Sequence, residues 1–250
     1  MTTWIGHLRI AEALLATRPG LDETAFAFGN LGPDSGIPND DWSEFDPPKA
    51  VTHFQHEGGG EDRIHDLAFY REYVLPLPPD DLRTSYRLGY FVHLLSDNLW
   101  SRWVGATTKR AFAAEYAAKG QQLITEIKWD WYDLDHRYVR DNPDSLFWRV
   151  VLPAANPPVD LPFLTESGVH FSLDHIRSFY GEPHPGLDLD RHYPYLNERN
   201  MTRYVEDAAA TIGELLRALD ARPALDGQTS GLFLLPAERL QPYAPPLGDA

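Results

Sequence analysis

The chain has 250 residues, of which 22 are basic and 37 acidic, so its formal net charge at pH 7 is −15. A chain of this length can bury a large core, and a composition of 43% hydrophobic and 24% charged residues is typical of a folded globular protein. The acidic balance argues against nucleic acid as the main partner. The absence of cysteine excludes disulfides, thiolate metal sites and cysteine nucleophiles. Any metal ion must therefore be held by His, Asp and Glu.

The first ten residues lack the basic region and apolar core of a secretory signal. No apolar run reaches the length of a membrane span. We therefore expect a cytoplasmic protein with no stable membrane insertion.

In the first quarter of the chain, one helix is followed by an irregular region. Residues 4–17 carry apolar side chains three and four positions apart, with Thr3 as the expected N-cap. Residues 29–48 form a long acidic stretch, whose Trp and Phe residues favour an ordered loop. We expect a second flexible point at the three glycines 58–60.

Helical patterns then continue to the end of the core. Residues 82–104 are apolar nearly all round, which predicts a helix buried at the centre of a bundle and capped by Asp80 and Asp81. Strand patterns are scarce, so we expect an all-α, multi-helix bundle forming a single domain over 1–250, with a core of about 4–221 and a Pro-rich tail of about 222–250. Further helices are expected at 66–75, 109–140 with a break near Gly120, 144–152, 170–180 and 200–221, with an irregular segment at 153–162.

The central predicted helix also carries the strongest chemical signal. His93 and Asp97 are four residues apart, so an imidazole and a carboxylate lie on one helix face, one turn apart. Two groups so placed can ligate one metal ion, and an Asp in so apolar a segment must be paired or bound to a metal. The alternative is a structural His–Asp hydrogen bond, or a pair with an arginine elsewhere.

Four motifs occur in order within residues 4–104: Trp4 with His7 in the first helix, Gly-x-x-Gly-Pro-Asp ending at Asp34, Thr-His-Phe around His53, and Gly-x-x-x-His-x-x-x-Asp over 89–97. In order and residue type they resemble the zinc-dependent phospholipase C family, which is similar in architecture to the P1-type nucleases. The resemblance implies an all-helical fold of phospholipase C/P1 nuclease type. It also implies a cluster of up to three zinc ions for phosphodiester hydrolysis.

Carried over residue by residue, the resemblance implies that Asp34, His53, His93 and Asp97 ligate one zinc ion. It makes His7 a ligand of a neighbouring ion, with Asp97 bridging the two. We also expect Asp34 to be the catalytic residue and the rest of the loop to shape the mouth of the pocket.

The second half of the chain departs from the family pattern. The family has a His shortly after the Asp97 position and a downstream His-x-x-x-Glu pair, and this chain has neither. Glu126, Asp130 and Asp133 fall on one face of a predicted helix and could supply carboxylate ligands instead. Carboxylates favour a harder ion such as Mn²⁺, Fe or Mg²⁺ at that second site. We expect one or two ions, zinc among them, rather than three.

The predicted function is hydrolysis of a small-molecule phosphoester by metal-activated water. One alternative is an HD-type phosphohydrolase, also all-helical, which would use His53, His65, Asp66 and Asp97. Another is a non-catalytic helical binding protein, in which the His/Asp cluster is structural or retains a metal without turnover.

Overall fold

The computed structural model describes residues 1–56, 63–78, 81–182, 184–221 and 225–249, and within them the fold is all-α. The α-helices and the two short strands are, in chain order, α1 (Trp4–Leu15), α2 (Glu23–Leu31), β1 (Ile37–Pro38), β2 (Phe45–Asp46), α3 (Lys49–Thr52), α4 (Asp66–Phe69), α5 (Leu82–Trp100), α6 (Ala106–Ala111), α7 (Ala113–Lys119), α8 (Gln121–Asp141), α9 (Glu166–Gly181) and α10 (Glu198–Asp220). Single π-helical turns follow α4 and α5 at Tyr70–Val74 and Ser101–Gly105, and another spans Phe147–Val151. Short 3₁₀ turns lie at Gly32–Asp34 (η1), Gly231–Leu234 and Ala237–Leu240.

Side-chain caps and one glycine set several helix boundaries. The hydroxyl of Thr3 accepts a hydrogen bond from Gly6 N at the start of α1, and the Asp81 carboxylate accepts one from Arg83 N at the start of α5. Gly120 has φ +56°, a left-handed conformation that glycine adopts without strain, and it separates α7 from α8. These three features confirm the sequence prediction.

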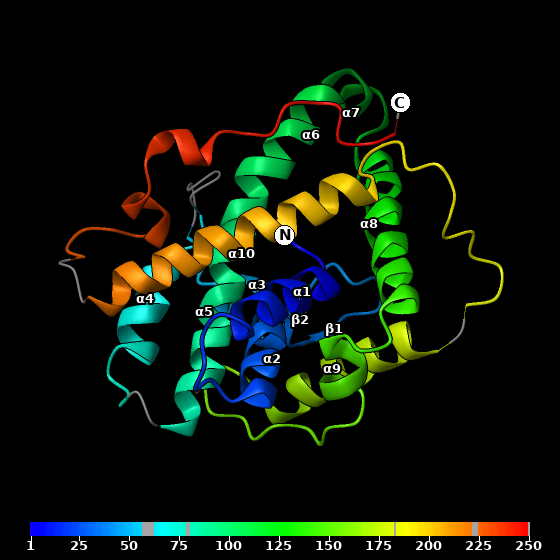
Figure 1. Cartoon of the computed structure of the whole chain (residues 1–250). Coiled ribbons are helices and arrows are strands. Elements are labelled where there is room, and N and C mark those ends of the chain that lie inside the picture. Colours follow the sequence, from blue (N-terminus) through cyan, green and yellow to red (C-terminus); the bar gives the residue numbers. More distant parts are fainter. Residues whose placement is uncertain (57–62, 79–80, 183, 222–224, 250) are drawn as a thin grey trace.

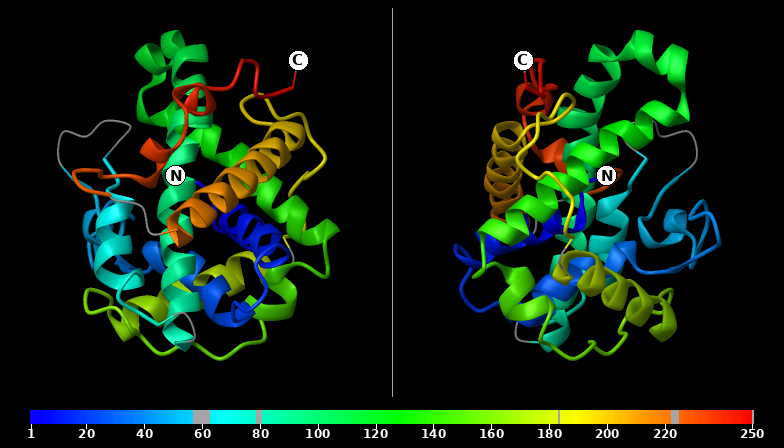
Figure 2. Two further views of the ribbon diagram at one scale, coloured as in Figure 1. Left: turned by 60° about the vertical axis from the view of Figure 1, so that its left-hand side comes forward. Right: turned by 90° about the vertical axis from the view of Figure 1, so that its right-hand side faces the viewer.

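Helix α5 is the centre of the molecule, as its two-sided apolarity predicts. Figures 1 and 2 show α1, α2 and α10 arranged around it, with α10 crossing in front of it in the view of Figure 1. From Gly89 to Trp100 every side chain of α5 is buried. The backbones of α2 and α5 come into direct contact, because a Cβ atom on Gly29 would lie 2.0 Å from Tyr86 O and one on Gly89 would lie 2.3 Å from Phe26 O.

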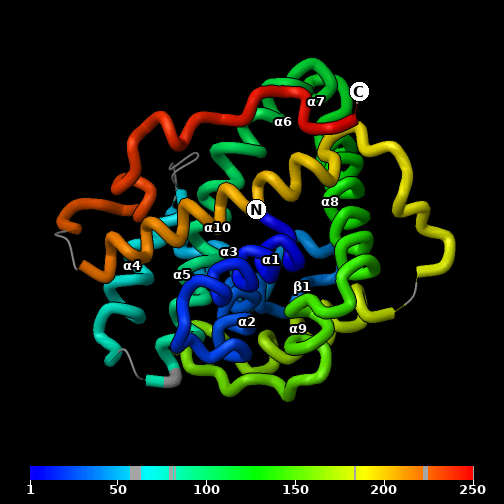
Figure 3. The backbone as a smooth tube through the Cα atoms, in the orientation of Figure 1, coloured from blue at the N-terminus to red at the C-terminus, as the bar shows by residue number. Residues whose placement is uncertain are grey.

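Two parts of the chain differ from the sequence prediction. Helix α2 is not predicted from the sequence, although Asp22 caps the helix by accepting a hydrogen bond from Ala25 N. The Pro-rich tail contains the two 3₁₀ turns and runs over the upper end of α6 (Figure 3), with Tyr243 and Leu247 buried against the body. The glycines 58–60 and the expected cap Asp80 lie outside the described residues.

None of the helices described is both long enough and apolar enough to cross a membrane.

Candidate metal centre

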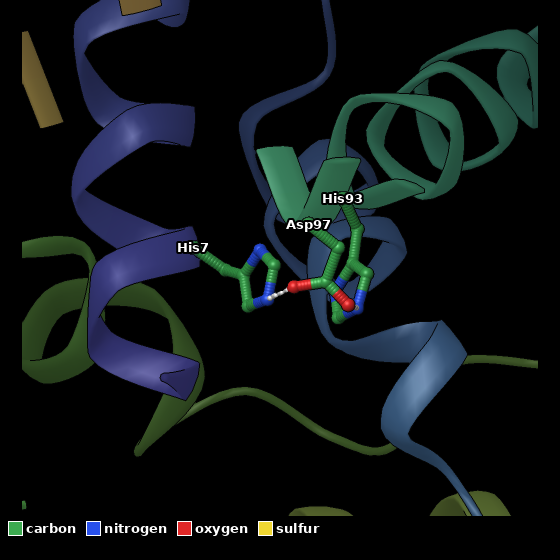
Figure 4. A group of neighbouring side chains, drawn as sticks. All are labelled: His7, His93 and Asp97. Carbon is green, nitrogen blue, oxygen red and sulfur yellow. Dashed lines mark ion pairs between the residues drawn. The ribbon is translucent and has the colours of Figure 1, made fainter. Parts of the chain in front are cut away.

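The structure brings five of the sequence-predicted ligands into one buried cluster. His7 comes from α1, Asp34 from η1, His53 from the residue after α3, and His93 and Asp97 from α5. Figure 4 shows His7 facing His93 and Asp97 across the gap between α1 and α5. The two imidazole rings of His7 and His93 are stacked, with centroids 3.6 Å apart. All five side chains are buried; Asp34 is 8% exposed and the other four are fully buried.

Asp97 lies between the three histidines. Its Oδ1 is 3.5 Å from His7 Nε2, and its Oδ2 is 3.7 Å from both His53 Nε2 and His93 Nε2. His53 Nε2 is also 3.5 Å from Asp34 Oδ1 and 3.4 Å from His93 Nε2. The cluster therefore consists of two overlapping triads, in each of which the candidate ligand atoms lie within 4.8 Å of one another: His7, His93 and Asp97, and Asp34, His53 and His93.

Backbone carbonyl groups fix the tautomers of two histidines. His93 Nδ1 is 2.7 Å from Asn30 O, and His53 Nδ1 is 3.1 Å from Lys49 O. A carbonyl oxygen can only accept, so both Nδ1 atoms carry the proton and donate it. Each Nε2 then presents a lone pair to the cluster, which is how metal-ligating histidines are commonly held.

A hydroxyl group does the same for His7. Ser96 Oγ donates to His93 O at 2.8 Å, so it accepts a hydrogen bond from His7 Nδ1 at 2.9 Å. His7 Nε2 is consequently unprotonated as well. Ser96 lies on the same helix as His93 and Asp97, and it therefore couples the orientation of α1 to that of α5.

Most of the polar atoms that converge in the cluster are acceptors, and this observation tests whether a cation fits. The exception is the backbone N–H of Thr2, which donates to Asp97 Oδ1 at 2.7 Å. His7 Nε2 and Asp97 Oδ2 are buried and have no hydrogen-bond partner among the described residues. The Nε2 atoms of His53 and His93 face each other at 3.4 Å, and the Nδ1 contacts to Lys49 O and Asn30 O assign the ring protons to the opposite nitrogens. Buried acceptors without a donor are costly, and a metal ion is the partner that satisfies nitrogen and carboxylate lone pairs together. Three imidazole nitrogens and two carboxylates are a donor set that suits Zn²⁺.

Four of the five groups in the cluster have lowered pKa values, which favours neutral imidazoles at His7 and His93 and ionised carboxylates at Asp34 and Asp97. Burial, followed by the charge of His93, holds the pKa of His7 well below its usual value, and burial lowers the pKa of His93 too. Burial alone would raise the pKa of Asp34, but the Lys49 ammonium and the nearby imidazoles outweigh it and hold that pKa well below the usual range. The pKa of Asp97 is also lowered against burial, first by the charge of the N-terminal amino group and then by the three histidines.

Asp34 connects the cluster to a cavity of about 350 Å³. The cavity is also lined by Gly36, Trp42 and Phe45, so the acidic loop forms part of its wall, as the sequence predicts. Lys49 Nζ lies 3.5 Å from Asp34 Oδ1 at the same place.

The predicted carboxylates of α8 have other partners. Arg191 forms ion pairs with Asp130 and Asp133, at 2.8 and 2.7 Å, and Asp130 also accepts from the backbone N–H groups of Tyr195 and Leu196. Glu126 is paired with Lys119 at 2.7 Å. The prediction that these three residues form a second metal site is thus corrected: their helix face is turned toward the segment around Arg191.

The opposite face of α8 is the one turned toward the cavity beside Asp34 and toward Thr3. Lys128 and Tyr132 line the cavity beside Asp34, and Asp135 accepts a hydrogen bond from the hydroxyl of Thr3 at 2.8 Å. These positions are four and three residues apart and so share one helix face. Sequence reasoning missed them because the acidic face of α8 carried the more obvious ligand types.

The set required by an HD-type phosphohydrolase does not assemble. Asp66 accepts from Asn98 Nδ2, Ser230 Oγ and the N–H of Gly231, which satisfies both of its carboxylate oxygens. The ring of His65 stacks on His56 at a centroid distance of 3.8 Å. This His–Asp pair therefore has a structural role, which is to tie the C-terminal segment to α4 and α5.

The comparisons with protein-family models, with curated proteins and with solved structures find no match to this chain. The resemblance to the zinc-dependent phospholipase C family therefore depends on the four motifs of the first 104 residues.

Proposed function

We propose that this protein is a metal-dependent phosphoesterase of phospholipase C/P1 nuclease type, which hydrolyses a phosphodiester bond with one or two zinc ions. The observation that carries the proposal is the convergence of three unprotonated imidazole nitrogens and two carboxylates, with buried acceptor atoms left without donors. When bound, such an ion supplies a Lewis acid and lowers the pKa of water, which is the chemistry that phosphodiester hydrolysis needs.

The positions of the five residues suit two neighbouring ion sites. Asp34, His53, His93 and Asp97 would hold one ion, and His7 and Asp97 would hold a second. The distances favour this division, because Oδ1 of Asp97 faces His7 and Oδ2 faces the other two histidines. The carbonyl and hydroxyl partners of the Nδ1 atoms keep the rings oriented.

Asp34 has a position suited to catalysis as well as binding. Its carboxylate belongs to the cluster and lines the cavity, so it can accept a hydrogen bond from water that enters from the cavity side and orient that water. Its low pKa keeps it ionised and therefore able to act as an acceptor at neutral pH.

Metal analysis and a hydrolysis assay test the proposal together. Protein purified without added metal should contain about one or two equivalents of zinc, and it should hydrolyse bis(4-nitrophenyl) phosphate. Asp34→Asn should abolish most of the hydrolysis, whereas Asp133→Asn, which removes a carboxylate paired with Arg191 outside the cluster, should leave it unchanged.

Two results would count against the proposal. Absence of bound transition metal, with no uptake of Zn²⁺ or Mn²⁺, would show that the cluster is structural. Stoichiometric zinc without hydrolysis of any phosphoester in a broad screen would favour the non-catalytic binding protein.

A further inference from the structure

The cavity beside Asp34 combines positive charge with aromatic walls. Two of the chain's four lysines, Lys49 from α3 and Lys128 from α8, line it. Such a concentration is unusual in a protein with a net charge of −15. The two ammonium groups enter from different helices, so the clustering is a product of the fold and not of a local run in the sequence.

The two lysines are in different electrostatic situations. Lys49 Nζ is shared between Asp34 Oδ1, at 3.5 Å, and the face of the Phe45 ring, at 4.4 Å from its centroid. Within the described part of the chain Lys128 forms no ion pair. Burial, and then the charge of Lys49, lowers the pKa of Lys128, as expected for two cations that lie near each other. An anion placed between them would relieve this repulsion.

The remaining walls are aromatic and come from three parts of the chain. Trp4 of α1 and Phe179 of α9 meet edge to face at 6.2 Å, and His175 of α9 lies 5.6 Å from Trp4. The acidic loop adds Trp42, whose ring is 4.8 Å from His175. Phe171, at the end of the same row on α9, is parallel to His175. Flat walls of this kind accept flat rings.

Trp42 is held over the cavity at a conformational cost. Its φ of +60° lies in the left-handed region, which is unfavourable for a bulky side chain. Its side chain is nevertheless 45% exposed, and Phe171 beside it is 38% exposed. Two exposed aromatic rings at the mouth of a cavity indicate a binding surface that a ligand covers.

We propose that this cavity binds the substrate of the metal centre, and that the substrate is a small phosphodiester in which one esterified group, the leaving group, is a flat, uncharged ring. The phosphate would lie between Asp34's end of the cluster and the ammonium groups of Lys49 and Lys128. The ring would lie among Trp4, Trp42 and the aromatic face of α9. This inference rests on the proposed function and specifies the substrate class for the same site.

The charge and the size of the cavity disfavour two other kinds of ester. A cationic group would be repelled by the two lysines, which occupy the same space. A volume of about 350 Å³ is near the lower end of the range for small-molecule pockets, which favours a small ester over a two-chain lipid. In the reaction, the oxygen of water would bond to phosphorus and the bond from phosphorus to the ring-bearing oxygen would break. That oxygen would leave with one proton from the water.

Phenylphosphonate is a suitable probe, because its carbon–phosphorus bond is not hydrolysed. Methylphosphonate is its control, since it keeps the anion and lacks the ring. Titration calorimetry on the zinc-loaded full chain should show phenylphosphonate binding at least about tenfold more tightly than methylphosphonate.

Matched variants separate the two contributions. Lys128→Met should weaken the binding of both probes by about tenfold or more, because a charge-assisted hydrogen bond is lost. Trp42→Ala should weaken only phenylphosphonate. Lys109→Met and Trp129→Ala, which remove an exposed lysine and an exposed tryptophan away from the cavity, should change neither.

The same titrations on chelator-treated protein distinguish this inference from the proposed function. Failure of the chain to retain zinc would overturn the metal-dependent reaction. Equal affinity for the two phosphonates, or unchanged affinity in both Lys128→Met and Trp42→Ala, would overturn the substrate class, even if zinc is retained and bis(4-nitrophenyl) phosphate is hydrolysed.

Discussion

At the scale of single residues, the two oxygens of Asp97 set the order in which metal should be lost. Asp97 lies within 3.7 Å of all three histidines. His7, within the cluster, contacts Asp97 and stacks on His93. Removal of the shared carboxylate affects both ion positions. Removal of His7 affects one.

We therefore expect Asp97→Ala to lower zinc affinity by more than about 100-fold, which exceeds the loss seen when an outer partner of a ligand is removed. His7→Ala should lose one of two ions, or leave a single ion weakened but bound. Competition with a chromophoric zinc chelator measures both. Asp135→Asn and His136→Ala serve as controls, because they alter a buried Asp and a buried His outside the cluster. A larger loss of zinc affinity in His7→Ala than in Asp97→Ala would refute the proposal that Asp97 is shared by both ions.

Asp135 offers a separate test by pH. Burial raises its pKa to about 7, and it accepts hydrogen bonds from Thr3 and Tyr180. A carboxyl with a raised pKa in the folded state contributes stability below its unfolded value of 3.8, and that contribution is lost as the pH rises toward about 7. The lowered pKa values of His7 and His93 act in the opposite direction, because they favour the folded state as the pH rises.

Asp135→Asn removes the pH dependence that comes from the raised pKa of Asp135 and leaves the one that comes from His7 and His93. The stability of the variant relative to wild type should therefore increase by roughly 2–4 kcal/mol between pH 4 and pH 8. Urea unfolding at several pH values gives this difference directly. A difference that stays constant with pH would mean that Asp135 is ionised throughout and that its two hydrogen bonds offset burial.

Residue types and the order of the motifs predicted which side chains come together in the cluster, but not the groups that hydrogen-bond to them. The four-residue interval between His93 and Asp97 is local information, and the motif order supplied the other three. The carbonyl of Asn30 and the hydroxyl of Ser96 act through tertiary contacts over more than sixty residues. No pattern in the sequence indicates such contacts.

At the scale of elements, the contact between α2 and α5 determines how well His93 is held. The two helices approach so closely that Gly89 has Phe26 O and Asn30 N as its nearest neighbours, at 2.3 and 3.1 Å from the position of a Cβ atom. The carbonyl of Asn30, one residue from the end of α2, is the acceptor for His93 Nδ1. Glycine at this position therefore supports the metal centre through the packing of two backbones.

Gly89→Ala should force α2 away from α5. We expect a loss of about 3 kcal/mol in the free energy of unfolding, the upper part of the range for overpacking. Zinc affinity should fall by about tenfold, because His93 loses its orienting acceptor. Gly213→Ala in α10 is the matched control: its nearest atoms are 3.6 Å away, so it should be neutral or stabilising by about 0.5–1 kcal/mol. Equal stability of the two variants would show that α2 adjusts without cost.

Long amphipathic helices could be predicted from periodicity, and short ones could not. The predicted helices over 82–104 and 200–221 agree with α5 and α10 within a few residues. Helix α2 has nine residues and includes Gly29, so its pattern is too short to separate from the loop that follows. The prediction for α8 gave the helix correctly and chose the wrong functional face, because periodicity shows which residues share a face but not what that face meets.

At the scale of the whole molecule, the cluster joins α1, η1, the residue after α3, and α5. All five residues belong to the first 97, while α8, α9 and α10 complete the cavity and the core around them. The first half therefore contains all five residues of the cluster. The second half supplies Lys128 and the aromatic row of α9, which the motifs of the first half do not predict.

Metal removal should consequently lower the stability of the whole fold. An ion that binds only the folded chain, present at about 1,000 times its dissociation constant, stabilises it by about 4 kcal/mol. For a chain of this size that corresponds to a rise of roughly 10 °C in Tm. Melting of the wild type should thus shift down by this amount when a chelator is added, and Asp97→Ala should show at most about a third of that shift, since a 100-fold weaker site is still partly filled. If the wild type melts at one temperature with zinc and with chelator, the buried acceptors are satisfied without a cation. His93 and Asp97 would then be a structural pair, and the hydrolase proposal would lose its main support.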